Sequence, residues 1–167
     1  TIATDSIVST PNIVLITMES MSADYMERFG NKAGLTPNLD SLYRRSVAFD
    51  RMIACGNRTV RGLEALTLSI PPSAGQSLIK RPEQKERRSI GSVLRERGYR
   101  TMFFYGGKSD FDNMGPFFAG NGYEVIDKDS YKPEEIKFSN IWGVCDEDSY
   151  DRMLTDLDAT AREGKPF

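Results

Sequence analysis

Two unbroken apolar runs and one apolar helical pattern organise the first two thirds of the chain. Residues 12–18 (NIVLITM) are rich in β-branched side chains and follow Pro11, which predicts a strand buried on both faces. Residues 100–105 predict a second strand of the same kind. Residues 59–70 are apolar on most sides at helical spacing. This pattern predicts a buried helix.

The remaining helices are predicted by their end signals. Thr36-Pro37 resembles an N-cap followed by proline at the first helical position, and the helix after it would bury Leu42 and Val47. Ser89 is expected to cap a further helix that buries Ile90. From about 146 to 162, apolar residues recur at helical spacing behind an acidic first turn, which predicts the last helix.

Strands that alternate with helices favour an α/β fold with a mostly parallel sheet flanked by helices. Residues 73–88 are polar and basic, so we expect a solvated surface loop there. No repeat or internal linker divides the chain, which indicates one domain. We expect this domain to be incomplete at its C-terminal side, because residues 165–167 would suit the start of another strand.

Composition narrows the class of protein without naming a function. The 167 residues are 39% hydrophobic and 28% charged, as in an ordinary globular domain. The formal net charge of −2 gives no basic footprint for nucleic acid, so no nucleic-acid partner is expected. No run approaches the roughly 18 apolar residues of a membrane-spanning helix.

The chain contains no histidine, which excludes a Ser-His-Asp triad, a Cys-His pair and imidazole metal ligands within these residues. Its chemistry must use carboxylates, hydroxyls, Lys, Arg or groups outside the chain. The two cysteines, Cys55 and Cys145, are too few for a disulfide framework and do not form a CxxC pair. Whether they pair with each other stays open from the sequence.

Two features come directly after the predicted strands. Glu19 follows the run of residues 12–18, and Gly106-Gly107 follows residues 100–105. Ligands of open α/β sheets bind beyond the carboxyl ends of the strands, so both features are candidates for a site. From its position alone, Glu19 is as compatible with capping a turn as with binding a metal ion.

A third feature is the start of the helix predicted from residue 59. Thr59 begins it, after a loop that contains Gly56, and Arg58 and Arg61 flank it. A helix N-terminus offers unpaired N–H groups and a positive dipole end, which suit phosphate or sulfate. A simple N-cap threonine is the alternative, and the local pattern favours it. A threonine hydroxyl becomes a nucleophile only when a base or a metal ion activates it.

Six motifs follow one another along the chain from residue 11. They are PNIVLITMES (11–20), LTPNLD (35–40), GNRTVRGLEA (56–65), FFYGG (103–107), FDNM (111–114) and WGVCDED (142–148). Taken together, these motifs resemble those of the sulfatase-like branch of the alkaline phosphatase superfamily, and within it they are most similar to lipoteichoic acid synthases and periplasmic phosphoglycerol transferases. The resemblance covers nearly all of the chain from residue 11.

The resemblance implies roles for two of these residues. Glu19 matches the family's carboxylate metal ligand, and Thr59 matches the threonine that both ligates the metal and attacks phosphorus. One divalent ion is implied, Mn²⁺ first, with Mg²⁺, Zn²⁺ or Ca²⁺ as alternatives. The family's Asp-His pair of ligands is expected downstream of Phe167, so these residues alone are expected to be inactive or nearly so.

The resemblance also implies a substrate pocket, with one departure. Lipoteichoic acid synthases carry a Trp and an Arg for the glycerophosphate where this chain has Asp112-Asn113-Met114, which places that substrate in doubt. Asp112 and Asn113 either face the pocket or form a turn, and Trp142 either lines the pocket or, more simply, packs in the core. The residues predicted to contact substrate are Arg58, Arg61, Lys108, Asp112, Asn113 and Trp142.

The family implies a phosphoglycerol or related phospho-group transferase that acts outside the cytoplasm at the cell membrane. Its donor would be a phospholipid head group and its acceptor a glycan or lipid of the envelope. Residues 1–10 would link the domain, residues 11–167, to an upstream transmembrane segment. Alternatives are a phosphoethanolamine transferase, an ester hydrolase, or a non-catalytic sensor or interaction domain on this fold. The residues from Thr59 to Leu63 lack the C/S-x-P-x-R motif of true sulfatases, which argues against their usual route.

Overall fold

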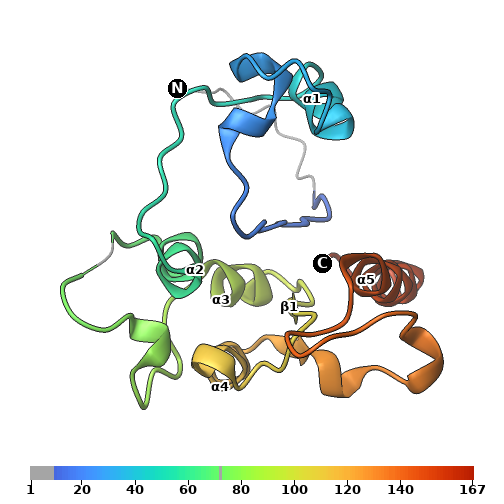
Figure 1. The fold of residues 1–167 in the computed structure, drawn as a ribbon. Coiled ribbons are helices and arrows are strands. Elements are labelled where there is room, and N and C mark those ends of the chain that lie inside the picture. Colours follow the sequence, from blue (N-terminus) through green and yellow to red (C-terminus); the bar gives the residue numbers. More distant parts are fainter. Residues whose placement is uncertain (1–9, 72) are drawn as a thin grey trace. The chain divides into compact units, whose positions relative to one another are not determined.

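The computed structural model describes residues 10–71 and 73–167, and it divides into two compact units (Figure 1). The larger unit comprises residues 55–167 together with the described residues up to Val14, and the smaller unit comprises residues 15–54. The predicted linker falls on residues 1–10, of which 1–9 lie outside the described residues. None of the helices in the described part of the chain is long and apolar enough to cross a membrane.

The larger unit contains a parallel two-stranded sheet. β1 (Met102–Phe104) pairs with β2 (Glu124–Ile126), and Phe103 lies opposite Val125. The chain crosses from β1 to β2 through α4 (Met114–Gly120), which contacts β2. The parallel α/β architecture is therefore confirmed. The apolar pattern of the sequence predicts β1 but not β2 or α4, because both are short.

The hydrophobic core lies between α4, β1 and α2 (Thr59–Leu68). Phe118 is buried and stacks on Phe103 with ring centroids 3.8 Å apart. The single-turn helix η3 (Leu78–Lys80) adds Ile79, which is fully buried. The prediction of a solvated loop over residues 73–88 is therefore wrong around Ile79, because one apolar side chain anchors this basic segment in the core.

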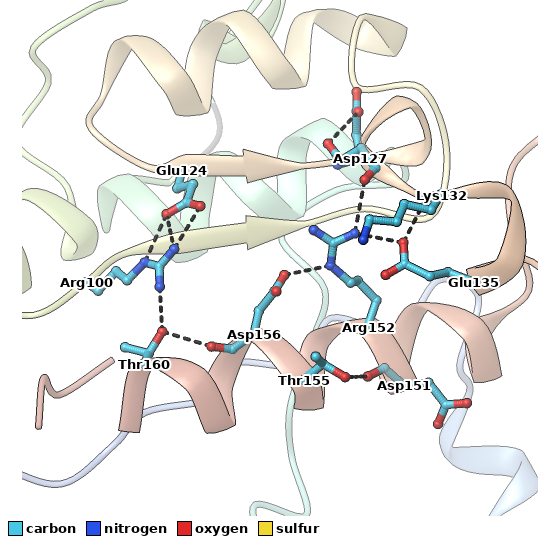
Figure 2. Close-up of polar contacts among 11 residues, drawn as sticks. Arg100, Glu124, Asp127, Lys132, Glu135, Asp151, Arg152, Thr155, Asp156 and Thr160 are labelled. Atoms are coloured by element: carbon cyan, nitrogen blue, oxygen red, sulfur yellow. Dashed lines mark hydrogen bonds and ion pairs between the residues drawn. The ribbon is translucent and has the colours of Figure 1, made fainter. Parts of the chain in front are cut away.

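The C-terminal helix is the best predicted element. α5 (Asp146–Arg162) begins with three acidic residues at its N-terminus, as its pattern indicates. Figure 2 shows how polar side chains connect it to the sheet: Arg100 binds both carboxylate oxygens of Glu124 and donates to Thr160 Oγ1 over 2.7 Å. Arg152 of α5 bonds Asp156 of the same helix and Glu135 of the segment between β2 and α5.

α3 (Ile90–Glu96) begins at the predicted cap. Ser89 Oγ accepts from Ser92 N, and Ser92 Oγ accepts from Ser89 N, which is a reciprocal capping box. Against the prediction, Ile90 is exposed, because the buried position of the first turn belongs to Gly91, which packs against the ring of Tyr123.

The predicted buried strand over residues 12–18 is wrong. These residues form no strand, and the side chains of Ile13, Val14, Leu15, Ile16 and Met18 are exposed. Among the described residues, the segment's backbone makes one hydrogen bond to another segment, from Ile13 N to Phe167 O over 2.6 Å. A strand requires a ladder of such bonds, and β1 and β2 do not extend one to this segment.

The smaller unit contains η1 (Ala23–Tyr25), η2 (Glu27–Phe29) and α1 (Pro37–Tyr43). α1 begins with Pro37 after Thr36, as predicted, and it ends at Tyr43, before Val47. The side chains of Leu42 and Val47 are both exposed. Its buried residue is Asp40, which accepts from Glu27 N and Thr36 Oγ1, both over 3.0 Å. These polar bonds hold α1 in this unit together with the contact between the rings of Tyr43 and Phe29, whose centroids are 6.2 Å apart.

Candidate functional site

The candidate nucleophile is the first residue of α2. Thr59 is exposed, and the extended residue before it, Arg58, occupies the N-cap position without a side-chain cap bond. The simple N-cap role is therefore wrong for Thr59. Its hydroxyl lies on the first turn of a ten-residue helix, at the positive end of the dipole.

A cavity of about 290 Å³ opens at the N-terminal end of α2. Three cationic side chains line it: Arg58 at the N-cap of α2, Arg61 within α2 and Lys80 from η3. Thr59 lies between two lining residues, Arg58 and Val60, but does not itself line the cavity. The sequence predicted Arg58 and Arg61 as phosphate partners but missed Lys80, which was counted as part of a solvated loop. The apolar pair Leu78-Ile79, directly before Lys80, is the signal in that basic stretch that could have placed Lys80 near the core.

Asp112 connects two of these cations. Its Oδ1 lies 2.5 Å from Lys80 Nζ, and its Oδ2 lies 3.8 Å from Arg58 Nη2. Its side chain is only 9% exposed. The next residue, Asn113, donates from Nδ2 to Ile79 O over 2.6 Å. The structure thus brings Asp112 and Asn113 to the same cluster as the cations.

A buried carboxylate, that of Glu64, bonds to the segments that carry the cations of this cluster. Glu64 of α2 has no exposed surface, and its Oε2 accepts from Ser77 Oγ (2.5 Å) and Leu78 N (3.1 Å). The same oxygen lies 3.4 Å from Arg61 Nη1. Because Ser77 caps η3, Glu64 ties the segment that carries Lys80 to the helix that carries Thr59. The sequence motifs predict no role for Glu64.

Two loops meet at the carboxyl ends of β1 and β2. Asp127 Oδ2 accepts from Ser109 N (3.0 Å) and Ser109 Oγ (2.5 Å), and Lys128 N donates to Gly107 O. Burial raises the pKa of the Asp127 carboxyl, but these bonds from Ser109 and the bond from Asp129 N outweigh it and lower the pKa. The Gly106-Gly107 loop is therefore fixed in place.

Lys108 and Trp142 are not among the residues that line the cavity. Lys108 is exposed and pairs with Asp129 over 3.4 Å. Trp142 is 73% exposed and contacts the edge of Phe111 with ring centroids 6.4 Å apart. Packing in the core is therefore wrong for Trp142. It lies beside Gly143, where a Cβ would clash with Gly106 O.

Glu19 is an exposed turn residue of the smaller unit, whereas Thr59 belongs to the larger unit. Within residues 10–71 and 73–167, no group of three or more His, Cys, Asp or Glu side chains could hold a metal ion. The described residues therefore do not form a complete metal centre by themselves. Cys55 and Cys145 are both free thiols, so they do not pair.

The family model described as Sulfatase matches residues 11–167. The chain belongs to the sulfatase family. Among curated relatives of this sulfatase-family chain, phosphoglycerol transferase I of Xanthomonas campestris pv. campestris is 28% identical over 169 residues, covering 93% of this chain and 24% of that protein. Phosphoglycerol transferase I of Escherichia coli O127:H6 is 26% identical over 171 residues, covering 93% and 22%. The chain thus spans about a quarter of the length of these relatives.

Two solved structures share the fold. A protein of the alkaline phosphatase superfamily from Vibrio parahaemolyticus is 39% identical with a TM-score of 0.73, covering 78% of this chain and 32% of that chain. The lipoteichoic acid synthase LtaP from Listeria monocytogenes is 18% identical with a TM-score of 0.70, covering 79% and 32%. The α/β fold of this sulfatase-family chain is therefore the alkaline phosphatase fold, over the part that aligns.

Proposed function

We propose that this chain carries the nucleophile of a transferase that moves a phosphoglycerol or related phospho group from a phospholipid to an envelope acceptor. The observation that carries the proposal is the position of Thr59, exposed on the first turn of α2, where its neighbours Arg58 and Arg61 line a cationic cavity together with Lys80. Relatives named phosphoglycerol transferase I support the group transferred. A phospholipid donor would be reached at the cell membrane, and we propose that the reaction takes place on its extracytoplasmic side.

In the proposed reaction, Thr59 Oγ attacks the phosphorus of the donor diester. The Oγ–P bond forms and the bond from phosphorus to the diacylglycerol oxygen breaks, with diacylglycerol leaving as the alcohol after it takes up the proton that Thr59 loses. An acceptor hydroxyl then attacks phosphorus and releases Thr59. The helix dipole of α2 and the nearby cations would stabilise negative charge on the phosphoryl oxygens.

Family membership supports a divalent cofactor, and we propose Mn²⁺ with Glu19 and Thr59 as two of its oxygen ligands. A bound divalent ion lowers the pKa of a ligated hydroxyl and offsets phosphoryl charge. The described residues do not complete such a centre, so we assign this chain only the nucleophile, the cationic cavity and these two oxygen donors.

The test is covalent labelling of the whole protein that contains these residues, with phosphatidylglycerol labelled in its head group. We expect label on the peptide that contains Thr59, abolished in Thr59→Ala and kept in Thr155→Ala, which removes an exposed helical threonine. Label that survives Thr59→Ala would overturn the assignment. Phosphatidylethanolamine as the preferred donor, or release to water alone, would instead assign the alternative transferase or a hydrolase.

A further inference from the structure

The first turn of α5 contains a buried carboxylate, that of Asp148, which the proposed reaction does not use. Asp148 is 1% exposed, whereas Asp146 and Glu147 on the same turn are exposed. Its Oδ2 accepts from Lys137 N over 2.7 Å and from Phe138 N over 3.1 Å. Burial raises the pKa of the Asp148 carboxyl, but the hydrogen bonds that it accepts, first that from Phe138 N, outweigh burial and lower the pKa. Asp148 therefore binds an earlier segment of the chain as a charged acceptor.

The segment that Asp148 binds is the start of a hairpin, residues 138–145. The two arms of this hairpin meet at an antiparallel bridge between Ser139 and Val144. The second arm runs directly into α5, which begins at the next residue. The bond to Phe138 N thus ties the first arm to the helix that the second arm enters, and Asp148 closes the base of the hairpin.

The hairpin lies against the loop that follows β1, backbone to backbone. Val144 N donates to Gly106 O over 2.9 Å. A Cβ on Gly143 would clash with Gly106 O. A Cβ on Gly107 would lie only 2.5 Å from Trp142 O. Because the crowded atoms belong to backbone, they cannot move aside as the end of a flexible side chain would. The position of the loop after β1 therefore depends on that of the hairpin.

The same loop reaches the N-terminal end of α2. Phe111 contacts the ring of Trp142 in the hairpin, with centroids 6.4 Å apart. The next residue, Asp112, lies with its Oδ2 3.8 Å from Arg58 Nη2. Arg58 is the N-cap residue of α2, and Thr59 follows it. The loop after β1 is therefore in contact with the hairpin along its first part and with the start of α2 at its end.

We propose that Asp148 is a positioning residue of the transferase, which fixes hairpin 138–145 and thereby holds the loop after β1 where Asp112 contacts Arg58 beside Thr59. A carboxylate suits this role, because hydrogen bonds to an ionised acceptor are about twice as strong as those between neutral groups. Asp148 acts through the hairpin and the loop. The inference rests on the proposed function, since the position of this loop affects the rate only if Thr59 is the nucleophile.

The test measures the rate at which phosphatidylglycerol labelled in its head group labels Thr59 in the whole protein, over a range of donor concentrations. Asp148→Ala should lower the maximal rate about 10- to 100-fold, the usual effect of a small misplacement in a reacting site. The donor concentration at half-maximal rate should change little. Asp148→Asn should give an intermediate loss, because its neutral oxygen is a weaker acceptor. Asp146→Asn, at an exposed carboxylate of the same turn, should keep the wild-type rate.

Two measurements separate positioning from a loss of stability. Rates are compared per folded molecule, well below the melting temperature of each variant, and a merely structural role would then leave the rate of Asp148→Ala at the wild-type value. In the same variant, Val144 N–H should exchange faster with deuterium, while Tyr105 N–H, bonded to Ile126 O over 2.9 Å, keeps its rate. Lys137 and Phe138 are exposed, so water can replace the carboxylate at their N–H groups.

A second variant tests the route through the hairpin. Gly143→Ala leaves Asp148 intact but places a Cβ against Gly106 O, so we expect a similar loss of maximal rate. The double variant should lose no more than the larger of the two single losses, because both changes act on one loop. Additive losses, or unchanged exchange at Val144 in Asp148→Ala, would overturn this route.

Failure of the positioning role is distinguishable from failure of the proposed function. Equal rates per folded molecule in wild type and Asp148→Ala, with Thr59 labelled in both, overturn the positioning role and leave the transferase standing. A wild-type protein that acquires no label at Thr59 overturns the transferase, and the positioning role with it.

Discussion

β1 and the apolar run of residues 12–18 differ in what lies beside them. β1 pairs along its whole length with β2, and Phe103 stacks on Phe118 of α4. Residues 12–18 have, among the described residues, one backbone hydrogen bond to another segment, and Ile16 is 53% exposed. Both runs are apolar and rich in residues that favour strands, so composition does not separate them.

The difference shows that an apolar segment forms a strand only when a second segment pairs with its backbone. Backbone N–H and C=O groups leave water only when a neighbouring segment accepts and donates their bonds. β1 obtains that neighbour from the chain that returns through α4 about twenty residues later. In the described part of the chain, residues 12–14 obtain such a backbone partner only at Phe167. An apolar run therefore predicts the capacity to form a strand, and the partner decides the outcome.

The largest test of this comparison removes the side chain that packs beneath β1. Phe118→Ala should lower the free energy of unfolding by about 3–5 kcal/mol, because it opens a cavity under Phe103. Ile16→Ala, the matched change in the unpaired run, should stay within about 0.5 kcal/mol. Urea denaturation measures both. Comparable losses in the two variants would mean that residues 12–18 are packed as tightly as β1.

Much of the fold was predictable where local chemistry decides it. The acidic first turn of α5, the capping box at Ser89 and the proline after Thr36 each act within one helical turn, and all three helices begin where these signals indicate. β2 was not predictable in this way, because a three-residue strand has too few positions to establish a period. Its pairing depends on β1, which is distant in sequence.

The same distinction between local and distant contacts applies to the residues of the candidate site. Thr59 and Arg58 were predictable because a helix start and its charges are adjacent in sequence. Lys80 was not, since its role depends on the burial of Ile79 and on Asp112, which lies 32 residues away. In the sequence, Glu64 is an ordinary helix residue. Its role depends on the hydrogen bonds that Ser77 and Leu78 donate to its carboxylate. Contacts between segments carry the information that a single sequence pattern lacks.

A smaller test concerns the contact that holds residues 11–14. Tyr99 is buried, and its hydroxyl donates to Pro11 O over 2.9 Å. Tyr99→Phe should cost about 1 kcal/mol, the usual net value of one hydrogen bond. The N–H of Ile13 should then exchange faster with deuterium, while that of Phe104 in β1 keeps its rate. Tyr150→Phe, at an exposed tyrosine, should change neither. Unchanged exchange at Ile13 would show that the bond to Phe167 holds this segment alone.

The smallest expected effect is the dependence of stability on pH at the carboxyl ends of β1 and β2, where Asp127 and Ser109 form a side-chain link between the two loops. The pKa of Asp127 is lowered in the folded state, because the hydrogen bonds from Ser109 outweigh its partial burial. A lowered carboxyl pKa stabilises the fold above the unfolded-state value of about 3.9. That contribution is lost as pH falls through the lower folded-state pKa.

Asp127→Asn should therefore reduce the difference in unfolding free energy between pH 7 and pH 3, by less than the effect of Tyr99→Phe. Asp110→Asn, an exposed carboxylate in the same loop, should keep the wild-type difference. Urea denaturation at the two pH values measures both variants. Other carboxylates also titrate in this range. The contribution of Asp127 is therefore given by the difference between the pH dependences of the two variants. Equal pH dependence in wild type and Asp127→Asn would mean that backbone pairing of β1 and β2 fixes this end of the sheet without the side-chain link.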